Sequence, residues 1–161
     1  MDKKEGLIEH DAVNNEYAGY VRTMESDVMN RVKLTDIQMY NPAILAYIGD
    51  SVYELFVRTL LVSKGSVQVS KLHKKAIAFV KAKAQAEMAD KLEAYLDEEE
   101  KDIIRRGRNA KTTSMPKNAE LADYKHATGF EALLGYLYLN NRMDRLMELL
   151  HLITEINQES I

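Results

Sequence analysis

The sequence predicts an all-α protein, and the scarcity of helix-breaking residues is the first observation behind this prediction. Only two prolines, Pro42 and Pro116, and seven glycines occur among the 161 residues, so long helical segments are rarely interrupted. The second observation is a strong helix start at Asn41, because asparagine is a good N-cap and the proline after it suits the first helical position. The length favours one domain with a hydrophobic core.

The pattern of apolar and polar residues changes near residue 33. Residues 1–33 are polar and show poor periodicity, so we expect an N-terminal extension there and a folded domain over residues 34–161. The first long helix should run from Pro42 to about Val62 and end near Gly65, a residue type common at helix C-termini. Its apolar residues surround the helix axis on most sides, which predicts burial deep in the domain or at a subunit contact.

Four further helices are expected after this first one. Ser70 can cap the first of the four, whose apolar face should pack inward while its lysines cover the outside. A loop is expected over residues 107–118, where glycine, proline and small polar residues gather. The expected helices span about residues 71–91, 97–105, 119–139 (with a break near Gly129) and 143–156.

One carboxylate, Asp50, lies in the middle of the mainly apolar run Leu45–Glu54 and directly follows Gly49. An unpaired charge among apolar residues is costly, and glycine within a helix costs about 1 kcal/mol relative to alanine. The segment Phe130–Gly135 repeats this pattern around Glu131. The two segments are therefore candidates for the halves of one site, although the residues alone also allow each acid to be a structural one. The glycines expected to let the two helices approach closely are Gly49, Gly129 and Gly135.

Basic residues gather in two segments although the net charge is −3. Residues 71–83 and residues 105–117 each contain five lysines or arginines and no acid. Local fields decide where a polyanion docks, so both segments are candidate nucleic-acid contacts, although a solvated helix face is the simpler interpretation of the lysines. The candidate contacts are Lys74, Lys75, Arg105, Arg106, Arg108, Lys111 and Lys117.

The composition disfavours several classes of protein. The absence of cysteine excludes disulfides, thiolate metal sites and a cysteine nucleophile, and it fits a reducing compartment. No run of about 18 uncharged apolar residues occurs, so no membrane span is expected. The first residues lead into no long apolar run, so no secretory signal is expected and we predict a cytoplasmic protein.

Several blocks of the sequence, in the same order, resemble the ribonuclease III domain. Tyr47–Val52 is similar to the signature segment of that family, and Phe130–Gly135 is similar to its second catalytic segment. The finer resemblance is to Mini-III, the short bacterial branch that has no double-stranded-RNA-binding domain. The blocks that resemble this branch are Leu72–Lys75, Ala82–Glu87, Arg105–Lys111 and Pro116–Asn118.

The resemblance implies a helical bundle like the ribonuclease III endonuclease domain, with residues 34–161 as the catalytic domain of a homodimer. It implies an endoribonuclease that hydrolyses double-stranded RNA and leaves 5′-phosphate ends. For the Mini-III branch, the implied substrate is the terminal stem of the 23S ribosomal RNA precursor, and a ribosomal protein is a candidate further partner. Asp50 and Glu131 would be the catalytic and metal-binding residues, with Mg²⁺ as the ion and Mn²⁺ able to substitute.

The four acids of the usual ribonuclease III site are not all present. Ala46 stands where the family has a glutamate, and Thr128 stands where it has an aspartate, so one or two metal ions per site are both open. Glu54, one helical turn after Asp50, is a further candidate ligand, and Asp123 is another. The missing acids also leave open a catalytically silent RNA-binding or ribosome-associated protein of the same fold. A helical interaction protein with no role in RNA binding is the second alternative.

Overall fold

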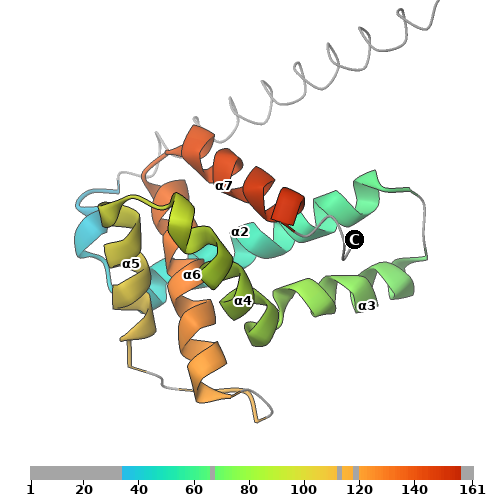
Figure 1. Ribbon diagram of the computed structural model, residues 1–161, viewed down its shortest axis with the longest axis horizontal. Helices are drawn as coiled ribbons and strands as arrows, with labels where there is room; N and C mark the ends of the chain where they lie inside the picture. Colours follow the sequence, from blue (N-terminus) through green and yellow to red (C-terminus); the bar gives the residue numbers. More distant parts are fainter. Residues whose placement is uncertain (1–33, 66–67, 112–113, 118–119, 157–161) are drawn as a thin grey trace, which may run out of the picture. The chain divides into compact units, whose positions relative to one another are not determined.

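The structure is a computed structural model, and its described part consists only of helices and their connections (Figure 1). No strand occurs in this part, which confirms the all-α prediction. The predicted N-terminal extension, residues 1–33, lies outside the described residues. The described residues are 34–65, 68–111, 114–117 and 120–156. The elements are η1 (Ile37–Met39), α2 (Pro42–Ser63), α3 (Val69–Val80), α4 (Ala82–Leu92), η2 (Glu93–Tyr95), α5 (Glu98–Arg108), α6 (Leu121–Leu139) and α7 (Met143–Ile156), where η marks a 3₁₀ turn.

Two helix starts follow directly from the capping chemistry of the sequence. Asn41 caps α2, because its Oδ1 accepts a hydrogen bond from the Ala43 backbone N–H at 2.9 Å. At α5, Asp97 and Glu100 form a reciprocal capping box, with each side chain accepting from the other's backbone N–H at 2.8 and 3.0 Å. Helix α5 continues to Arg108, so the loop expected from residue 107 begins later than predicted.

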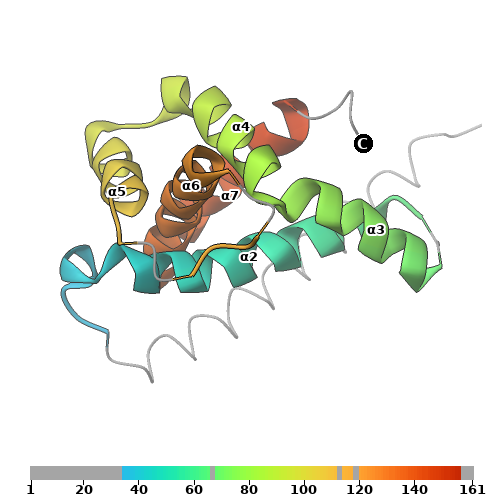
Figure 2. The ribbon, with the colours of Figure 1, turned by 90° about the horizontal axis from the view of Figure 1, so that it is seen from below.

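The sequence predicted a single helix over residues 71–91, and this prediction is wrong. The chain forms two helices in this region, α3 and α4. They are separated at Lys81, whose backbone is extended (φ −67°, ψ 149°). The N-cap of α3 is Gln68, not the expected Ser70. The break at Lys81 lets α3 lie beside α2 while α4 turns onto α6 (Figure 2).

Helix α6 is the central helix, and it packs against α2, α4, α5 and α7 (Figures 1 and 2). A helix that is apolar on all sides is typical of the centre of a bundle. The break that the sequence suggested near Gly129 does not occur, because α6 is continuous through it. Its buried residues are Ala127, Gly129, Phe130, Ala132, Leu133, Leu134, Gly135, Tyr136 and Leu137.

Helix α2 places one face against α6 and leaves the opposite face exposed. Leu45, Tyr53 and Val57 are buried, whereas Tyr47 and Leu55 are 76% and 68% exposed. The apolar character of α2 on most sides is therefore not explained by burial within the described part of one chain. The other expectation, a subunit contact, stays a prediction.

The backbones of α2 and α6 touch where two glycines meet the opposite helix. A Cβ on Gly49 would lie 1.7 Å from the carbonyl oxygen of Glu131, and a Cβ on Gly135 would lie 1.9 Å from the carbonyl oxygen of Leu45. Neither position has room for any side chain, so only glycine allows this crossing. Gly129, expected to serve the same crossing, faces α5 instead, where its Cβ would lie 2.7 Å from a carbonyl oxygen of that helix.

A buried ion pair fixes the start of α5 against α7. The fully buried carboxylate of Glu100 accepts hydrogen bonds from Arg145 Nε and from a terminal nitrogen of the same guanidinium, at 2.8 and 2.9 Å. Burial acts to raise the pKa of Glu100, but the hydrogen bonds and the charge of Arg145 outweigh burial and hold that pKa below its ordinary value. This ion pair joins the first turn of α5 to α7, and α5 itself packs against α6.

Replacing Gly49 by alanine should lower the free energy of unfolding by more than about 3 kcal/mol. Inserting atoms into a packed core typically costs about 1–3 kcal/mol, and here the new Cβ meets backbone atoms that have no freedom to move aside. The gain in helix propensity, about 1 kcal/mol, is too small to offset this cost. Urea unfolding followed by circular dichroism measures the change.

Ser51→Ala, at an exposed position of the same helix, is the matched control and should change stability by less than about 0.5 kcal/mol. A Gly49→Ala protein as stable as the parent would contradict the close backbone contact.

Candidate functional site

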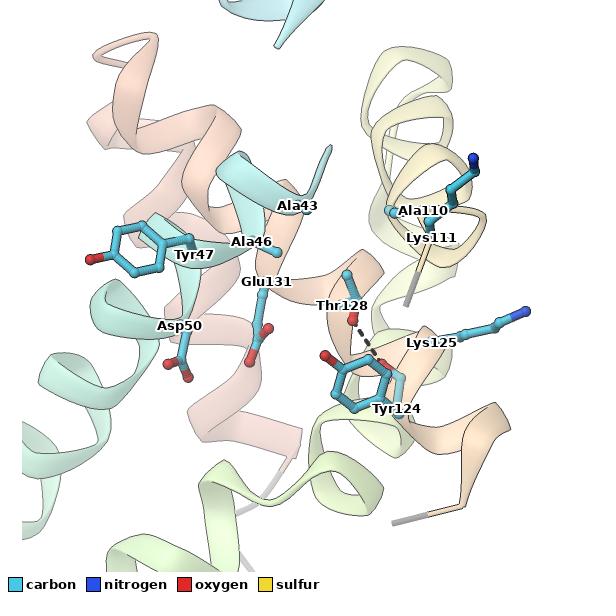
Figure 3. Close-up of a pocket in the computed structure, with 11 residues that line it drawn as sticks. Ala43, Ala46, Tyr47, Asp50, Ala110, Lys111, Tyr124, Lys125, Thr128 and Glu131 are labelled. Carbon is cyan, nitrogen blue, oxygen red and sulfur yellow. Dashed lines mark hydrogen bonds between the residues drawn. The ribbon is translucent and has the colours of Figure 1, made fainter. Parts of the chain in front are cut away.

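A cavity of about 330 Å³ lies between α2, α6 and the end of α5. Its walls combine two carboxylates, three hydroxyl groups and two lysines, which is a polar lining for a site beside the core. Figure 3 shows the side chains that surround it. The polar residues that line it are Tyr47, Asp50, Lys111, Tyr124, Lys125, Thr128 and Glu131.

Asp50 and Glu131, the two acids singled out in the sequence, both lie at this cavity. The carbonyl oxygen of Glu131 is the atom that approaches Gly49, the residue before Asp50, so the backbone contact brings both acids to the same place. Figure 3 shows their carboxylates side by side and pointing the same way from α2 and α6. Asp50 is exposed, and Glu131 is half-buried.

The surroundings of Glu131 disfavour its charged form. Burial is the main reason that the pKa of Glu131 rises to about 8, and the negative charges of Asp50 and Glu54 raise it further. The neighbouring Gln85 side chain opposes this rise, although its Nε2 forms no hydrogen bond of normal geometry with any described residue. No cation is among the groups that act most on the pKa of Glu131, and a bound cation would supply the compensating charge.

The two positions where the sequence departs from the four-acid pattern lie at the same cavity. Ala46 is on α2 one turn before Asp50, and Thr128 is on α6 one turn before Glu131. The Thr128 hydroxyl donates a hydrogen bond to the Tyr124 carbonyl oxygen at 2.9 Å. The cavity thus holds a methyl group and a hydroxyl where the usual pattern has two further carboxylates.

The remaining candidate acids do not line the cavity. The Glu54 carboxylate pairs with Arg58 at 2.7 Å, although its charge still acts on Glu131. Asp123 is half-buried near the start of α6 and is not part of the cavity wall. The structure therefore brings Asp50 and Glu131 together at the cavity. Glu54 lies near them but forms an ion pair with Arg58.

The donor set at the cavity fits a hard divalent cation. No group of three or more histidine, cysteine, aspartate or glutamate side chains suited to a metal ion occurs in the described ranges. Mg²⁺ prefers oxygen ligands and keeps several of its waters, so one or two carboxylates are sufficient to bind it. Asp50 and Glu131 provide such a pair, and the unpartnered amide nitrogen of Gln85 beside Glu131 is a further sign of an incomplete polar site.

Of the seven basic residues predicted to contact RNA, Lys111 lines the cavity. Arg106 instead donates hydrogen bonds to the backbone carbonyl oxygens of Gln38 and Tyr40, at 2.7 and 3.1 Å. These bonds tie α5 to the segment that precedes α2. Arg106 therefore stabilises the fold, a role that the sequence did not indicate. Its contact with RNA stays a prediction.

The other predicted contacts lie away from the cavity wall. Arg105 forms an ion pair with Asp102 on the same helix. The remaining side chains, exposed and free to meet a large polyanion, are Lys74, Lys75, Arg108 and Lys117.

Sequence reasoning missed four residues of the site. Tyr124 and Lys125 precede Thr128 by one helical turn, and Tyr47 precedes Asp50 by one turn, so helical spacing from the two acids could have identified them. Gln85 lies in the block Ala82–Glu87 that resembles the Mini-III branch, which was the only signal for it, because helical spacing from the two acids does not reach α4.

Comparison with known proteins decides the family. Residues 43–142 match the family described as Ribonuclease III domain. The chain belongs to the ribonuclease III family. The predicted all-α ribonuclease III fold and the predicted endoribonuclease are therefore confirmed. This family acts on RNA and generally depends on divalent metal ions.

Similar curated proteins bear the name Mini-ribonuclease 3, which confirms the resemblance to the Mini-III branch. The protein from Clostridium tetani is 49% identical over 126 residues, covering 78% of this chain and 83% of its own length. The protein from Thermoanaerobacter sp. is 44% identical over 142 residues, covering 84% of this chain and all of its own length (100%). An X-ray crystal structure of a Fusobacterium nucleatum protein is similar with a TM-score of 0.67 and 32% identity, covering 76% of this chain and 98% of that one.

None of the described helices has both the length and the apolarity needed to cross a membrane.

The raised pKa of Glu131 predicts that the metal-free protein loses stability as pH rises from about 5 to about 8. The folded state keeps a proton on Glu131 up to about pH 8, whereas the unfolded chain releases it near the ordinary value of 4.5. Between these values the folded state binds more protons, so raising the pH favours unfolding. Thermal midpoints measured across this range in EDTA check the trend.

Glu131→Gln should flatten this fall in the thermal midpoint, because glutamine has no proton to release. Glu87→Gln, at an exposed position on α4, is the control and should keep the slope of the parent. Equal slopes in the parent and in Glu131→Gln would show that Glu131 does not have the raised pKa.

Proposed function

We propose that the protein cuts double-stranded RNA with one Mg²⁺ ion per chain, held by Asp50 and Glu131. The observation that supports this most strongly is that the two carboxylates meet at one cavity, with burial and like charge raising the pKa of Glu131 to about 8. Membership of the ribonuclease III family supports phosphodiester hydrolysis as the reaction. The products would carry 5′-phosphate ends, and Mn²⁺ would substitute for Mg²⁺.

The residues of the chain would mainly position the RNA and balance charge. When bound, the ion supplies a nucleophile at neutral pH and relieves the charge that builds up on the phosphoryl and leaving oxygens. Asp50 and Glu131 hold it at the crossing of two helices, where backbone contact fixes their separation. Lys111 and Lys125, which extend from the other side of the cavity in Figure 3, attract the phosphates next to the one that is cut.

The donors that the cavity offers support one ion per chain rather than two. Ala46 has no donor atom, and the Thr128 hydroxyl already bonds a carbonyl oxygen of its own helix. Glu54 pairs with Arg58 and stays outside the cavity wall. A second ion would therefore depend mainly on water, whereas the first has a carboxylate from each helix.

Double-stranded RNA suits the distribution of exposed basic residues. A-form RNA is recognised largely by shape, through phosphates and 2′-hydroxyl groups along the shallow groove. Arg108 ends α5, Lys111 follows it at the cavity, and Lys117 is exposed further along the same connection, so this segment would follow the RNA backbone. Lys74 and Lys75 on α3 would hold it at a second point.

A homodimer would cover the exposed apolar face of α2. Ile44, Leu55 and Val62 lie on this face and are about half or more exposed. Large exposed apolar side chains that gather on one helix face are typical of a site of association. Two chains joined there would each present one cavity, as the cutting of both RNA strands requires.

The precise substrate rests on the resemblance to the Mini-III branch. We propose the terminal stem of the 23S ribosomal RNA precursor, in the cytoplasm, with a ribosomal protein as a further partner. Residues 34–161 would then be the whole catalytic unit, and substrate choice would depend on the shape of the stem.

A catalytically silent RNA-binding protein is the alternative, and the two missing carboxylates at Ala46 and Thr128 favour it. A parent protein that binds duplex RNA but never cuts it, with Mg²⁺ or Mn²⁺ present, would establish this alternative.

Asp50→Asn and Glu131→Gln should each reduce cleavage of duplex RNA by more than about 100-fold. Loss of a residue that only supports a metal ligand typically costs about 10–100-fold, so loss of a ligand should cost more. Cleavage of a labelled RNA hairpin in Mg²⁺ is the measurement, and EDTA should abolish the activity of the parent. Circular dichroism shows whether each variant is folded.

Glu87→Gln serves as the control for the removal of an acid outside the cavity and should cut at the rate of the parent. Full activity in a folded Asp50→Asn protein would exclude the proposed site.

Lys111→Ala should weaken binding of duplex RNA at low salt and make the affinity less dependent on salt. Each phosphate contact contributes about 0.9 to the slope of log affinity against log salt for a duplex, so the slope should fall by about that amount. Gel-shift titrations at several salt concentrations, with Asp50→Asn as the background to prevent cutting, measure it. Lys101→Ala removes a cation of α5 that pairs with Glu98, and it should leave the slope unchanged.

A further inference from the structure

Gln85 is a buried polar residue whose amide nitrogen has no hydrogen-bond partner. It lies on α4 and is 1% exposed. Its Nε2 atom is buried and makes no hydrogen bond to any described residue. Buried polar side chains are nearly always hydrogen-bonded, so such an exception calls for a physical reason.

The other buried side chains of the helix that carries Gln85 are apolar. Ala86, Met88, Ala89 and Leu92 are the other buried residues of α4. Helix α4 packs against α6, whose residues next to Glu131 are fully buried and apolar. An amide in such a place is costly unless it has a polar partner.

Glu131 is the polar group within reach of Gln85. The Gln85 side chain lies close enough to the Glu131 carboxyl group for a hydrogen bond, and its helix α4 packs directly against α6. Asp50 and Glu54, which also act on Glu131, are carboxylates and cannot donate a hydrogen bond to it when charged. The two N–H groups of the amide carry no charge, so they would stabilise a carboxylate without repelling a cation bound to it.

We propose that Gln85 is a positioning residue for the metal site, and that its amide donates a hydrogen bond to the Glu131 carboxylate once a divalent cation is bound there. This inference rests on the proposed function of Asp50 and Glu131. Metal-binding carboxylates are themselves hydrogen-bonded by neighbouring groups, which fix the orientation of the oxygen that faces the ion. Gln85 on α4 would do this for Glu131 on α6, so the site draws on three helices instead of two.

The fully buried position of Gln85 supports this role over direct contact with RNA. A side chain that is 1% exposed has no access to a phosphate group of the substrate. The role also explains why an unpaired polar atom is kept in an apolar layer. The amide would gain its partner when a bound ion fixes the orientation of the Glu131 carboxylate.

The test compares Mn²⁺ binding by full-length parent and variant proteins, measured by isothermal titration calorimetry without RNA. Gln85→Met keeps the length and approximate volume of the side chain and removes the amide. We expect its dissociation constant for Mn²⁺ to rise by about 10–100-fold, with a thermal midpoint in EDTA that is equal to or above that of the parent. Cleavage of duplex RNA should recover towards the parent rate when Mn²⁺ is raised enough to saturate the weakened site.

Met88→Leu is the matched control, because it changes another buried residue of α4 without altering a polar group. Its Mn²⁺ affinity should stay within about twofold of the parent, as expected for a conservative substitution away from the site. Gln85→Leu is the second variant, for use if Gln85→Met does not fold, and it should weaken Mn²⁺ binding to a similar extent.

A folded Gln85→Met or Gln85→Leu protein with the Mn²⁺ affinity of the parent, while Glu131→Gln loses that affinity, would overturn the role of Gln85 and leave the proposed site intact. Unchanged Mn²⁺ affinity in Asp50→Asn and Glu131→Gln as well would instead overturn the proposed site itself.

Discussion

The contact between the backbones of α2 and α6 is the constraint on which the rest of the site depends. The carbonyl oxygen of Glu131 occupies the space that a Cβ on Gly49 would need, and the carbonyl oxygen of Leu45 does the same at Gly135. Two helices that carry ordinary side chains at their contact stay about 8–10 Å apart. Glycine at both positions removes this spacing, so Asp50 and Glu131 come to lie side by side at one cavity although they are far apart in the sequence.

Placing two carboxylates side by side destabilises the protein without a bound cation, and this destabilisation indicates what the site is for. Burial and neighbouring negative charge both act against ionisation of Glu131, and a buried amide nitrogen beside it lacks a partner. A structural acid would normally have a cation nearby, as Glu100 has in Arg145. The contrast between these two glutamates distinguishes Glu100, which is paired within the fold, from Glu131, for which we propose a bound cation as the partner.

Local chemistry explains which parts of the fold could be predicted from the sequence. The starts of α2 and α5 depend on Asn41 and Asp97, whose side chains bond backbone groups a few residues away. The division between α3 and α4 at Lys81 could not be predicted in this way, because no glycine or proline marks it. The break predicted near Gly129 is the opposite kind of error, because a break was predicted where none occurs. Gly129 allows close packing against α5 and does not bend α6.

The candidate site, like the fold, could be predicted from the sequence only in part. Asp50 and Glu131 stood out because each is a lone acid among apolar residues with a glycine nearby. Gln85 lay within the block Ala82–Glu87 that resembles the Mini-III branch, but its burial near Glu131 depends on which face of α4 packs against α6, and this the sequence does not show. Arg106 was predicted from charge alone, and only the fold shows that it holds backbone carbonyl groups ahead of α2.

A crystal structure of the full chain soaked in Mn²⁺, with an anomalous difference map, tests the central claim most directly. We expect one strong peak per chain, within coordination distance of both the Asp50 and the Glu131 carboxylates. A peak bound elsewhere, or one that only a single carboxylate contacts while the other points away, would contradict the account.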